Sequence, residues 1–305
     1  MGSQLRTGCH TECGRRPVNQ DAVLAVRLAD GRELVAVADG MGGHSAGEIA
    51  SQRALETVRT RLKAGDALRV AVAEANAAVH AEAAANPAWN GMGTTLVAML
   101  RAGSSYEIAN VGDSRAYRIT SDAVTQITTD HSFVAEAARE ARLATHDIVS
   151  SRWRNALTRA LGTEADVEVD CFGPFDVDEP HAILLCSDGL YRSVSDDVLR
   201  RHVGSTTDPW AAARSLAAEA YRNGSADNIS AAVILMGCVD APVPDVAAPA
   251  DGSVTSPAAT VSQPAQHTRV HRRRGRSRRG RRADIQLGIA VVLLVVVLAV
   301  LMRVW

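Results

Sequence analysis

The amino-acid sequence predicts an α+β fold: a four-layer αββα sandwich of two stacked, mainly antiparallel β-sheets flanked by helices, followed by a C-terminal transmembrane helix. Several strand-like segments follow one another before a helix intervenes, which favours stacked sheets over a doubly wound parallel sheet. Pairs of helix-like segments separate these strand-rich stretches. Near residue 240 the composition changes, and the chain ends in a long apolar segment.

The first half of the chain holds most of the expected strands. The turn Ala29-Asp30-Gly31-Arg32 separates two apolar runs and predicts a hairpin. In the helix that follows, Leu55, Val58 and Leu62 lie near one face with charges elsewhere. The expected elements here are strands at 22–28 and 33–39, helices at 45–63 and about 66–85, and strands at 94–101, 105–111, 115–119 and 123–127.

In the second half, helix-like and strand-like segments alternate. Its last strand pattern follows Asn228. The expected elements are two short helices within 132–160, strands at 166–172 and 181–187, helices at 195–203 and 209–222, and a strand at 229–236.

Charge is distributed unevenly along the chain. The first 240 residues carry 23 basic and 31 acidic side chains, a net charge of about −8, and nine arginines lie between Arg269 and Arg282. An acidic domain argues against nucleic acid as a partner, because phosphate binding needs clustered Lys and Arg. It suits a site that collects divalent cations.

The five cysteines are scattered, and the first 14 residues contain no apolar run that resembles a secretory signal. We therefore expect reduced thiols in the cytoplasm. Cys9, His10 and Cys13 suggest zinc, but no second ligand pair follows at a useful spacing.

The C-terminal region predicts a linker and a membrane anchor. Residues 241–268 hold five of the ten prolines and no Lys or Arg, which is typical of a flexible linker. Residues 285–302 are apolar except for Gln286, and as a helix they would span about 27 Å of a hydrocarbon layer about 30 Å thick. The arginines before this segment predict a single-pass anchor in the cell (inner) membrane, with the preceding domain in the cytoplasm. Attraction to anionic lipid headgroups explains the arginine block better than a nucleic-acid tail does.

Four aspartates stand where apolar strand patterns begin or end, next to small residues. Asp39 and Asp188 each end a strand and precede glycine, Asp113 follows a strand, and Asp227 precedes one. Any one alone reads as a turn residue, since Asp-Gly is a common turn dipeptide. Four in succession can converge between the sheets, where mutual repulsion calls for hard cations such as Mg²⁺ or Mn²⁺. Gly40 lets the backbone approach such ions, so its carbonyl is a further expected ligand.

Eight motifs extend this pattern along the chain: RPVNQD (16–21), DGMGGHSAGEIAS (39–51), MGTTL (92–96), VGDSR (111–115), DHS (130–132), TRALG (158–162), LLCSDGL (184–190) and SADNIS (225–230). Their order and spacing resemble the bacterial branch of the type 2C metal-dependent serine/threonine protein phosphatases. The resemblance covers residues 6–238, the expected catalytic domain. It is followed by the linker (239–268), an Arg-rich juxtamembrane segment (269–284) and the transmembrane helix (285–302).

The resemblance implies hydrolysis of phosphoserine and phosphothreonine by metal-bound hydroxide at a dinuclear Mn²⁺ or Mg²⁺ centre, without a covalent phosphoenzyme. It implies that Asp39 bridges two ions, with the Gly40 carbonyl on one and Asp188 and Asp227 on the other. It implies a third, weaker ion at Asp113 and Asp188. The expected partners are phosphoproteins and a membrane-associated serine/threonine kinase with its targets.

The resemblance also implies catalytic roles for three residues. Arg16 would bind the substrate phosphate, because its planar guanidinium matches two phosphate oxygens. Asp21 would orient the attacking water. His44 is either the general acid for the leaving oxygen or a structural histidine, because the eukaryotic branch has its histidine directly after Asp-Gly, where this chain has Met41.

Two other functions remain open from the sequence. The GDS of VGDSR suggests a serine esterase with Ser114 as nucleophile, but no Asp-x-x-His pair follows late in the chain. A phosphatase fold that is catalytically weak and senses or docks phosphoproteins is the second alternative. All four metal-site aspartates are present, which favours an enzyme.

Overall fold

The structure, a computed structural model, describes residues 6–43, 45–139 and 156–237. The chain divides into two units between residues 244 and 245, and the second unit lies wholly outside the described residues. The predicted linker, arginine-rich segment and transmembrane helix also lie outside them. In the described part of the chain, every helix is too short or too polar to cross a bilayer.

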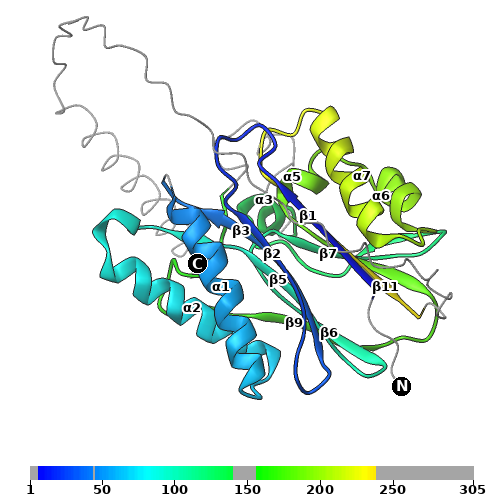
Figure 1. Ribbon diagram of the computed structural model, residues 1–305. Helices are drawn as coiled ribbons and strands as arrows, with labels where there is room; N and C mark the ends of the chain where they lie inside the picture. Colours follow the sequence, from blue (N-terminus) through cyan, green and yellow to red (C-terminus); the bar gives the residue numbers. More distant parts are fainter. Residues whose placement is uncertain (1–5, 44, 140–155, 238–305) are drawn as a thin grey trace, which may run out of the picture. The chain divides into compact units, whose positions relative to one another are not determined.

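Two antiparallel sheets form the centre of the first unit (Figure 1). Within the described residues, the five-stranded sheet has the order β1 (Arg6–Glu12), β11 (Ile229–Met236), β10 (His181–Cys186), β7 (Arg115–Ile119) and β8 (Val124–Gln126). The other sheet has the order β2 (Asp21–Arg27), β3 (Glu33–Met41), β5 (Leu96–Ala102), β6 (Ser105–Val111) and β9 (Asp170–Asp176), with β4 (Gly93–Thr94) paired to β3. This confirms the predicted α+β class with antiparallel sheets.

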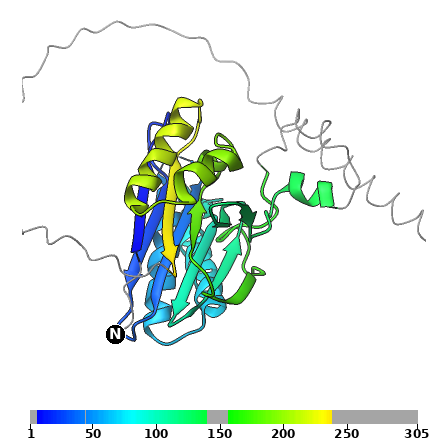
Figure 2. The same ribbon diagram turned by 90° about the vertical axis from the view of Figure 1, so that its right-hand side faces the viewer.

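Helices cover the outer faces of both sheets. On the sheet that contains β3 lie α1 (Ala46–Lys63) and α2 (Leu68–Ala85), and the short η1 (Pro87–Trp89) follows them. On the sheet that contains β11 lie α5 (Asp188–Tyr191), α6 (Asp196–Val203) and α7 (Pro209–Arg222). The view in Figure 2 shows α6 and α7 on one side of the strands and α1 and α2 on the other. Helix α3 (Phe133–Arg139) follows β8.

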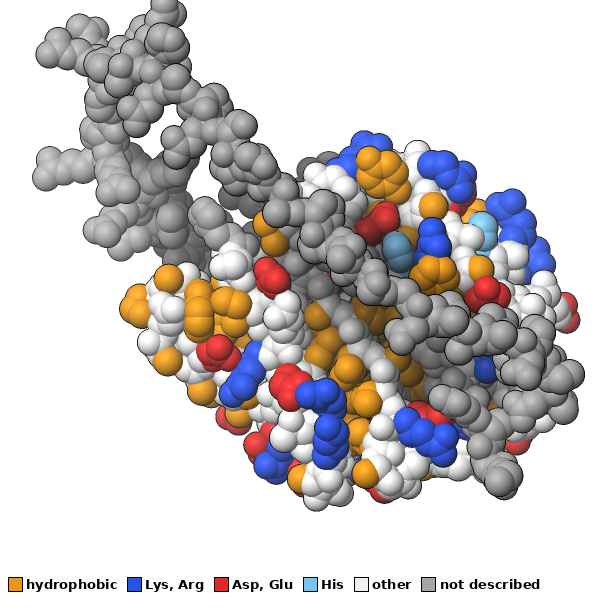
Figure 3. Space-filling model, viewed as in Figure 1, with side chains coloured by type: hydrophobic (Ala, Val, Ile, Leu, Met, Phe, Trp, Pro, Cys, Tyr) orange, Lys and Arg blue, Asp and Glu red, His pale blue; other side chains and the backbone are white. Residues whose placement is uncertain are grey.

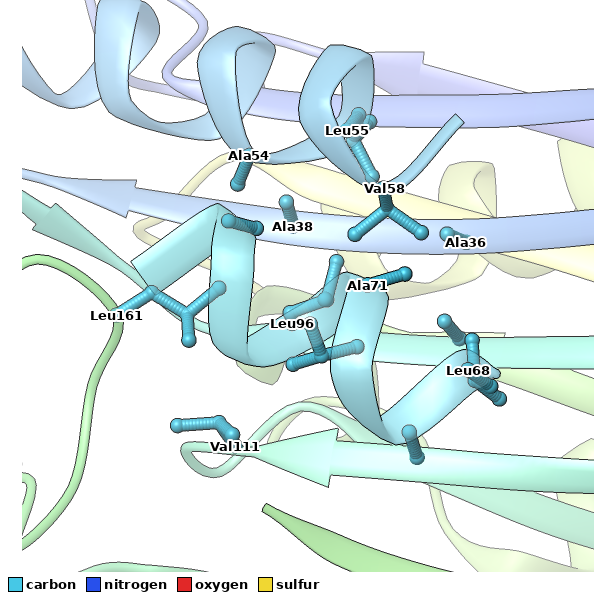
Figure 4. Close-up of a cluster of buried hydrophobic side chains, with 14 of the residues drawn as sticks. Ala36, Ala38, Ala54, Leu55, Val58, Leu68, Ala71, Leu96, Val111 and Leu161 are labelled. Atoms are coloured by element: carbon cyan, nitrogen blue, oxygen red, sulfur yellow. The ribbon is translucent and has the colours of Figure 1, made fainter. Parts of the chain in front are cut away.

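Three apolar layers hold the sandwich together. Figure 4 shows the first, where Leu55 and Val58 of α1 lie near the small side chains of β3 and Leu68 of α2 belongs to the same cluster. The second lies between the sheets and contains Val35 and Ile183, and the third lies under α7. Each fully buried leucine or valine contributes about 1.5–3 kcal/mol. The scarcity of aromatic residues is therefore offset by many Ala, Val and Leu contacts.

The outer face of α1 and α2 carries acidic and basic side chains interspersed (Figure 3). Arg53 pairs with Glu82 across the two helices, and Arg59 pairs with Glu56 within α1. Exposed pairs of this kind contribute about 0.2–1 kcal/mol each. This face is a solvated surface, and it leaves the apolar faces of both helices to the core.

Most of the predicted elements agree with the structure to within two residues, and three differ. Strand β1 was not predicted. Strand β9 begins at Asp170 rather than 166, because Val167 and Val169 pack in a loop against the core under α1 and α2. Of the two helices expected within 132–160, α3 is present, and the second falls largely on residues 140–155, outside the described part.

Candidate metal centre

Five aspartates meet at one end of the sandwich, and they come from both sheets. Asp21 begins β2 and lies opposite Asp39 of β3 in the strand register. Asp113 lies in the connection from β6 to β7, Asp188 begins α5 just after β10, and Asp227 precedes β11. A cavity of about 560 Å³ is lined by Arg16, Asp39, Gly40, Asp113, Asp188 and Asp227.

Asp39 is held through its backbone by Thr94 of β4 and by Thr95, which directly precedes β5. Its N–H donates to Thr95 Oγ1 at 3.0 Å, and its carbonyl accepts from the Thr95 N–H and from Thr94 Oγ1, both at 2.9 Å. Thr95 Oγ1 also shares a 2.7 Å hydrogen bond with Ser114 Oγ. Ser114 is fully buried, so it is a structural residue and is not placed as an exposed nucleophile.

Gly40 is required by close backbone packing. A Cβ at this position would lie 2.0 Å from the Gly47 carbonyl oxygen of α1 and 2.5 Å from that of Gln20. Both neighbours are backbone atoms that cannot move aside without shifting α1 or the loop before β2. Only glycine therefore lets the end of β3 line the cavity.

Asp21 lies behind the cavity, buried between the sheets. Its Oδ2 accepts from Ser187 Oγ at 2.8 Å and from Ser230 Oγ at 2.7 Å. Within the described residues its Oδ1 is buried without a hydrogen-bond partner. Burial raises the pKa of Asp21 to about 6, although both serines oppose the shift. A buried carboxylate oxygen directed at no protein donor suits a residue that orients water.

Arg16 lies at the exposed rim of the cavity, next to Asp227. Its Nη2 donates to Asp227 Oδ2 at 2.9 Å and its Nε donates to the Ala226 carbonyl at 3.1 Å. Asn228 fixes the loop that carries Arg16, because its amide donates to the carbonyls of Cys13 and Val18. The guanidinium has five N–H donors, so donors remain for an anion in the cavity.

Asp113 and Asp188 share a second arginine. Arg192 Nη2 donates to Asp113 Oδ2 at 3.0 Å, and its Nη1 lies 3.2 Å from Asp188 Oδ2. The loop before Asp113 is held by buried His131, whose Nδ1 accepts from the Gly112 N–H while its Nε2 pairs with Asp170. Burial lowers the pKa of His131, so the neutral ring with Nδ1 as acceptor is the stable form.

The carboxylates make one another costly to ionise. Burial raises the pKa of Asp39 well above its usual range, and repulsion from Asp21 and Asp188 adds to the shift. Burial raises the pKa of Asp113 to about 6, with repulsion from Asp188 next in size. Burial likewise raises the pKa of Asp188, against the opposing charge of Arg192. The site is therefore short of positive charge at neutral pH.

These residues fit a hard divalent cation by donor type and charge. Among the described residues, no group of three or more His, Cys, Asp or Glu is arranged to hold a metal ion as it stands, and Arg16 and Arg192 contact carboxylate oxygens of the site. The candidate ligand atoms on the aspartates and on Gly40 are all oxygens, and Asp188 Oδ1 is buried without a partner in the described part of the chain. Oxygen-rich sites with excess negative charge are those that Mg²⁺ and Mn²⁺ prefer.

The structure does not test every predicted site residue, and the sequence analysis did not identify every residue that supports the aspartates. His44 lies outside the described residues. Cys9 and Cys13 are free thiols, and His10 pairs with Glu12 rather than with either cysteine. The missed contributors include Thr95, Ser187, Ser230 and Arg192, which support the aspartates. Thr95, Ser187 and Ser230 lie within the motifs MGTTL, LLCSDGL and SADNIS, whereas Arg192 lies outside every motif named above.

Comparison with known proteins gives one family. Residues 13–223 match the family model of protein phosphatase 2C. The chain is 37% identical over 236 residues to the serine/threonine phosphatase stp of Listeria innocua, covering 73% of this chain and 93% of that one. The structure is similar to that of the serine/threonine phosphatase Stp1 from Staphylococcus aureus (TM-score 0.71, 32% identity, 79% and 97% coverage). It is also similar to the catalytic domain of the serine/threonine protein phosphatase PstP, which was solved with two manganese ions (TM-score 0.65, 32% identity, 76% and 98% coverage).

Proposed function

The chain belongs to the protein phosphatase 2C family and is a protein serine/threonine phosphatase, and we propose that it acts at a centre of two Mn²⁺ or Mg²⁺ ions. In this proposal water attacks the phosphorus of phosphoserine or phosphothreonine directly, and no covalent phosphoenzyme forms. The observation that carries it is the convergence of carboxylates from both sheets on one cavity with an arginine at its rim.

Asp39, Asp188, Asp227 and the Gly40 carbonyl would hold the two ions. When bound, the ions would lower the pKa of a water and neutralise charge on the phosphoryl oxygens. The two manganese ions in the related PstP structure support this assignment. The raised pKa of Asp39 and of Asp188 supports it as well, because both carboxylates lack sufficient counter-charge.

The remaining steps belong to side chains of this chain. Arg16 would bind two phosphate oxygens through the N–H groups that its present contacts leave available. Asp21 would accept a hydrogen bond from the attacking water through its unpartnered Oδ1. His44 would donate the proton that the leaving serine or threonine oxygen needs.

The first test assays phosphate release from a phosphothreonine peptide by the purified full chain in detergent. We expect activity with Mn²⁺ that excess EDTA removes and that fresh Mn²⁺ restores. Activity that persists in EDTA would contradict the two-ion centre. A folded chain that binds Mn²⁺ and the peptide but releases no phosphate would instead indicate a phosphoprotein-binding module.

Arg16 and His44 are tested by separate kinetic readouts. Arg16→Ala should mainly raise KM, because it removes a phosphate contact and leaves the carboxylates in place. An unchanged KM would contradict its role. His44→Gln should lower kcat more for a peptide, whose alkoxide leaving group needs a proton, than for an aryl phosphate with a good leaving group. Equal losses for both substrates would indicate a structural histidine.

We further propose that residues 285–302 anchor the chain in the cell membrane with the catalytic domain in the cytoplasm. The apolar length and the preceding arginines support this orientation. Phosphoproteins at the same membrane, including a serine/threonine kinase and its targets, are the substrates that such an anchor favours. Protease added outside intact cells should leave the catalytic domain whole, whereas its digestion would reverse the orientation. Recovery of the full chain in the soluble fraction of lysed cells would contradict the proposed membrane anchor.

A further inference from the structure

The guanidinium of Arg192 lies between the two carboxylates of Asp113 and Asp188. It is 3.0 Å from Asp113 Oδ2 and 3.2 Å from Asp188 Oδ2, through two different nitrogens. The side chain of Asp113 is 7% exposed and that of Asp188 is 15% exposed, so both carboxylates are shielded from solvent, whereas the Arg192 side chain is 32% exposed. One cation of the chain thus serves both carboxylates.

The local fold fixes Arg192 in this position. Asp188 is the first residue of α5 and Arg192 directly follows its last, so the two side chains are four residues apart on one helical face. The Arg192 N–H also donates to the Asp188 carbonyl at 3.1 Å. A short helix with this spacing places the guanidinium within reach of the Asp188 carboxylate.

Tyr191 and Arg115 lie on the other side of the contact between Arg192 and Asp113. Tyr191 Oη donates to Asp113 Oδ2 at 3.4 Å, and the Arg115 guanidinium lies 3.7 Å from the centre of the Tyr191 ring. Arg115 is itself fixed by a two-nitrogen contact with Asp130. These contacts restrict rotation of the Tyr191 side chain, which contacts Asp113 beside Arg192.

We propose that Arg192 is the resident cation between Asp113 and Asp188 and keeps a divalent ion out of that position. This rests on the proposed function, which places two ions at Asp39, Asp188 and Asp227. It replaces the third ion that the family resemblance implies at Asp113. A third ion would have to break both contacts of Arg192 and would place a divalent charge directly beside its guanidinium cation.

The test counts Mn²⁺ ions bound per full-length chain by titration calorimetry and by equilibrium dialysis. The wild type should bind two ions. Arg192→Gln should bind a third, because it leaves both carboxylates without a counter-charge, and Asp113→Asn in that background should remove it. Arg192→Lys keeps the charge and should bind two. Arg201→Gln removes an exposed arginine of α6 and is the matched control, also with two.

A second readout does not depend on how well the Arg192 variants fold. Asp113→Asn in the otherwise wild-type chain should still bind two ions, because Asp113 pairs with Arg192 and not with an ion. A loss of one ion in this variant would overturn the proposal. Two ions in a folded Arg192→Gln chain would also overturn it.

Parallel phosphate release separates this proposal from the proposed function. If the wild-type chain hydrolyses the phosphopeptide and binds three ions, the proposed phosphatase mechanism still holds and the proposed role of Arg192 is wrong. A wild-type chain that binds no ions contradicts both. Two ions in the wild type and three in Arg192→Gln support both.

Discussion

At the scale of single residues, the charge of Asp39 is unfavourable in the metal-free fold. It is buried, and both burial and repulsion from neighbouring aspartates raise its pKa. Asp39→Asn removes that charge at almost constant volume. We expect loss of turnover together with a higher free energy of unfolding in EDTA, because function and stability oppose each other at such a residue. Phosphate release and urea unfolding in EDTA measure the two effects.

Asp30 provides the matched control, since it is also an aspartate before glycine. It lies in the exposed β2–β3 turn, where its Oδ2 pairs with Arg32 Nε at 2.7 Å. Asp30→Asn should keep wild-type turnover and should change stability little, because the Asp30–Arg32 pair is exposed to solvent. If Asp39→Asn retained turnover like Asp30→Asn, Asp39 would be a turn residue and the metal assignment would be wrong.

Ser114 separates the phosphatase from the esterase alternative. Its hydroxyl is buried and bonds only to Thr95 Oγ1 among the hydrogen bonds described. Ser114→Ala should therefore keep phosphopeptide turnover within a few-fold and cost about 1 kcal/mol of stability, the net value of one buried hydrogen bond. Thermal unfolding and the Mn²⁺-dependent assay measure these. Complete loss of activity in a folded variant would contradict the structural role.

The sequence predicted the aspartates of the site but not the residues that hold them. Asp39 and Asp188 could be found because each follows an apolar run and precedes glycine, which is a local pattern. Ser187 supports Asp21 from 166 residues away, and Ser230 does so from 209 residues away. Both serines lie within motifs that the sequence analysis names, but only the folded structure shows that they donate to Asp21.

At the scale of elements, α7 begins with a strong cap. The Asp208 carboxylate accepts from the N–H groups of Trp210 and Ala211, both at 3.0 Å, and Pro209 occupies the first helical position. Asp208→Ala should cost about 1 kcal/mol in the free energy of unfolding. Ser195 caps α6 without a side-chain hydrogen bond, so Ser195→Ala should cost far less. Urea unfolding of both variants tests this, and equal costs would mean that the cap does not stabilise α7.

Elements with a clear apolar period were predicted well, and those that depend on tertiary contacts were not. The pattern of 209–222 is helical by period alone and agrees with α7. Strand β1 contains Gly8 and His10 and few bulky apolar residues, so its composition did not indicate a strand. It forms because β11 supplies an antiparallel partner. A Cβ on Gly8 would lie 2.1 Å from the backbone nitrogen of Trp210, so glycine there lets α7 pack directly on β1.

At the scale of the whole molecule, the apolar packing of the sandwich offsets the unfavourable repulsion among the five carboxylates of the site. Asp21 and Asp39 come from one sheet, Asp188 and Asp227 from the ends of strands in the other, and Asp113 from the connection between them. Three apolar layers bring these charges together without any direct attraction between them. Cations that bind only the folded chain should recover part of this cost.

The stabilisation by Mn²⁺ should therefore depend on pH. The raised pKa of Asp21 and of Asp113, each about 6, means that these carboxyls stabilise the metal-free fold below pH 4. That contribution is lost as the pH rises through about 6. Burial also raises the pKa of the proposed ligands Asp39 and Asp188, and Mn²⁺ binds their ionised forms. The effect of Mn²⁺ on the unfolding midpoint should therefore be small at about pH 5 and several degrees at about pH 7.5.

The comparison must be made between Mn²⁺ and EDTA at each pH, because two buried histidines act in the opposite direction. Burial lowers the pKa of His131 and of His181, so both stabilise the fold above about pH 6.5 and lose that effect as the pH falls. Their contribution is common to both conditions and cancels in the difference. Asp39→Asn should abolish most of the Mn²⁺ shift at about pH 7.5. A shift that is constant across this range, or larger in acid, would mean that Mn²⁺ does not bind at these carboxylates.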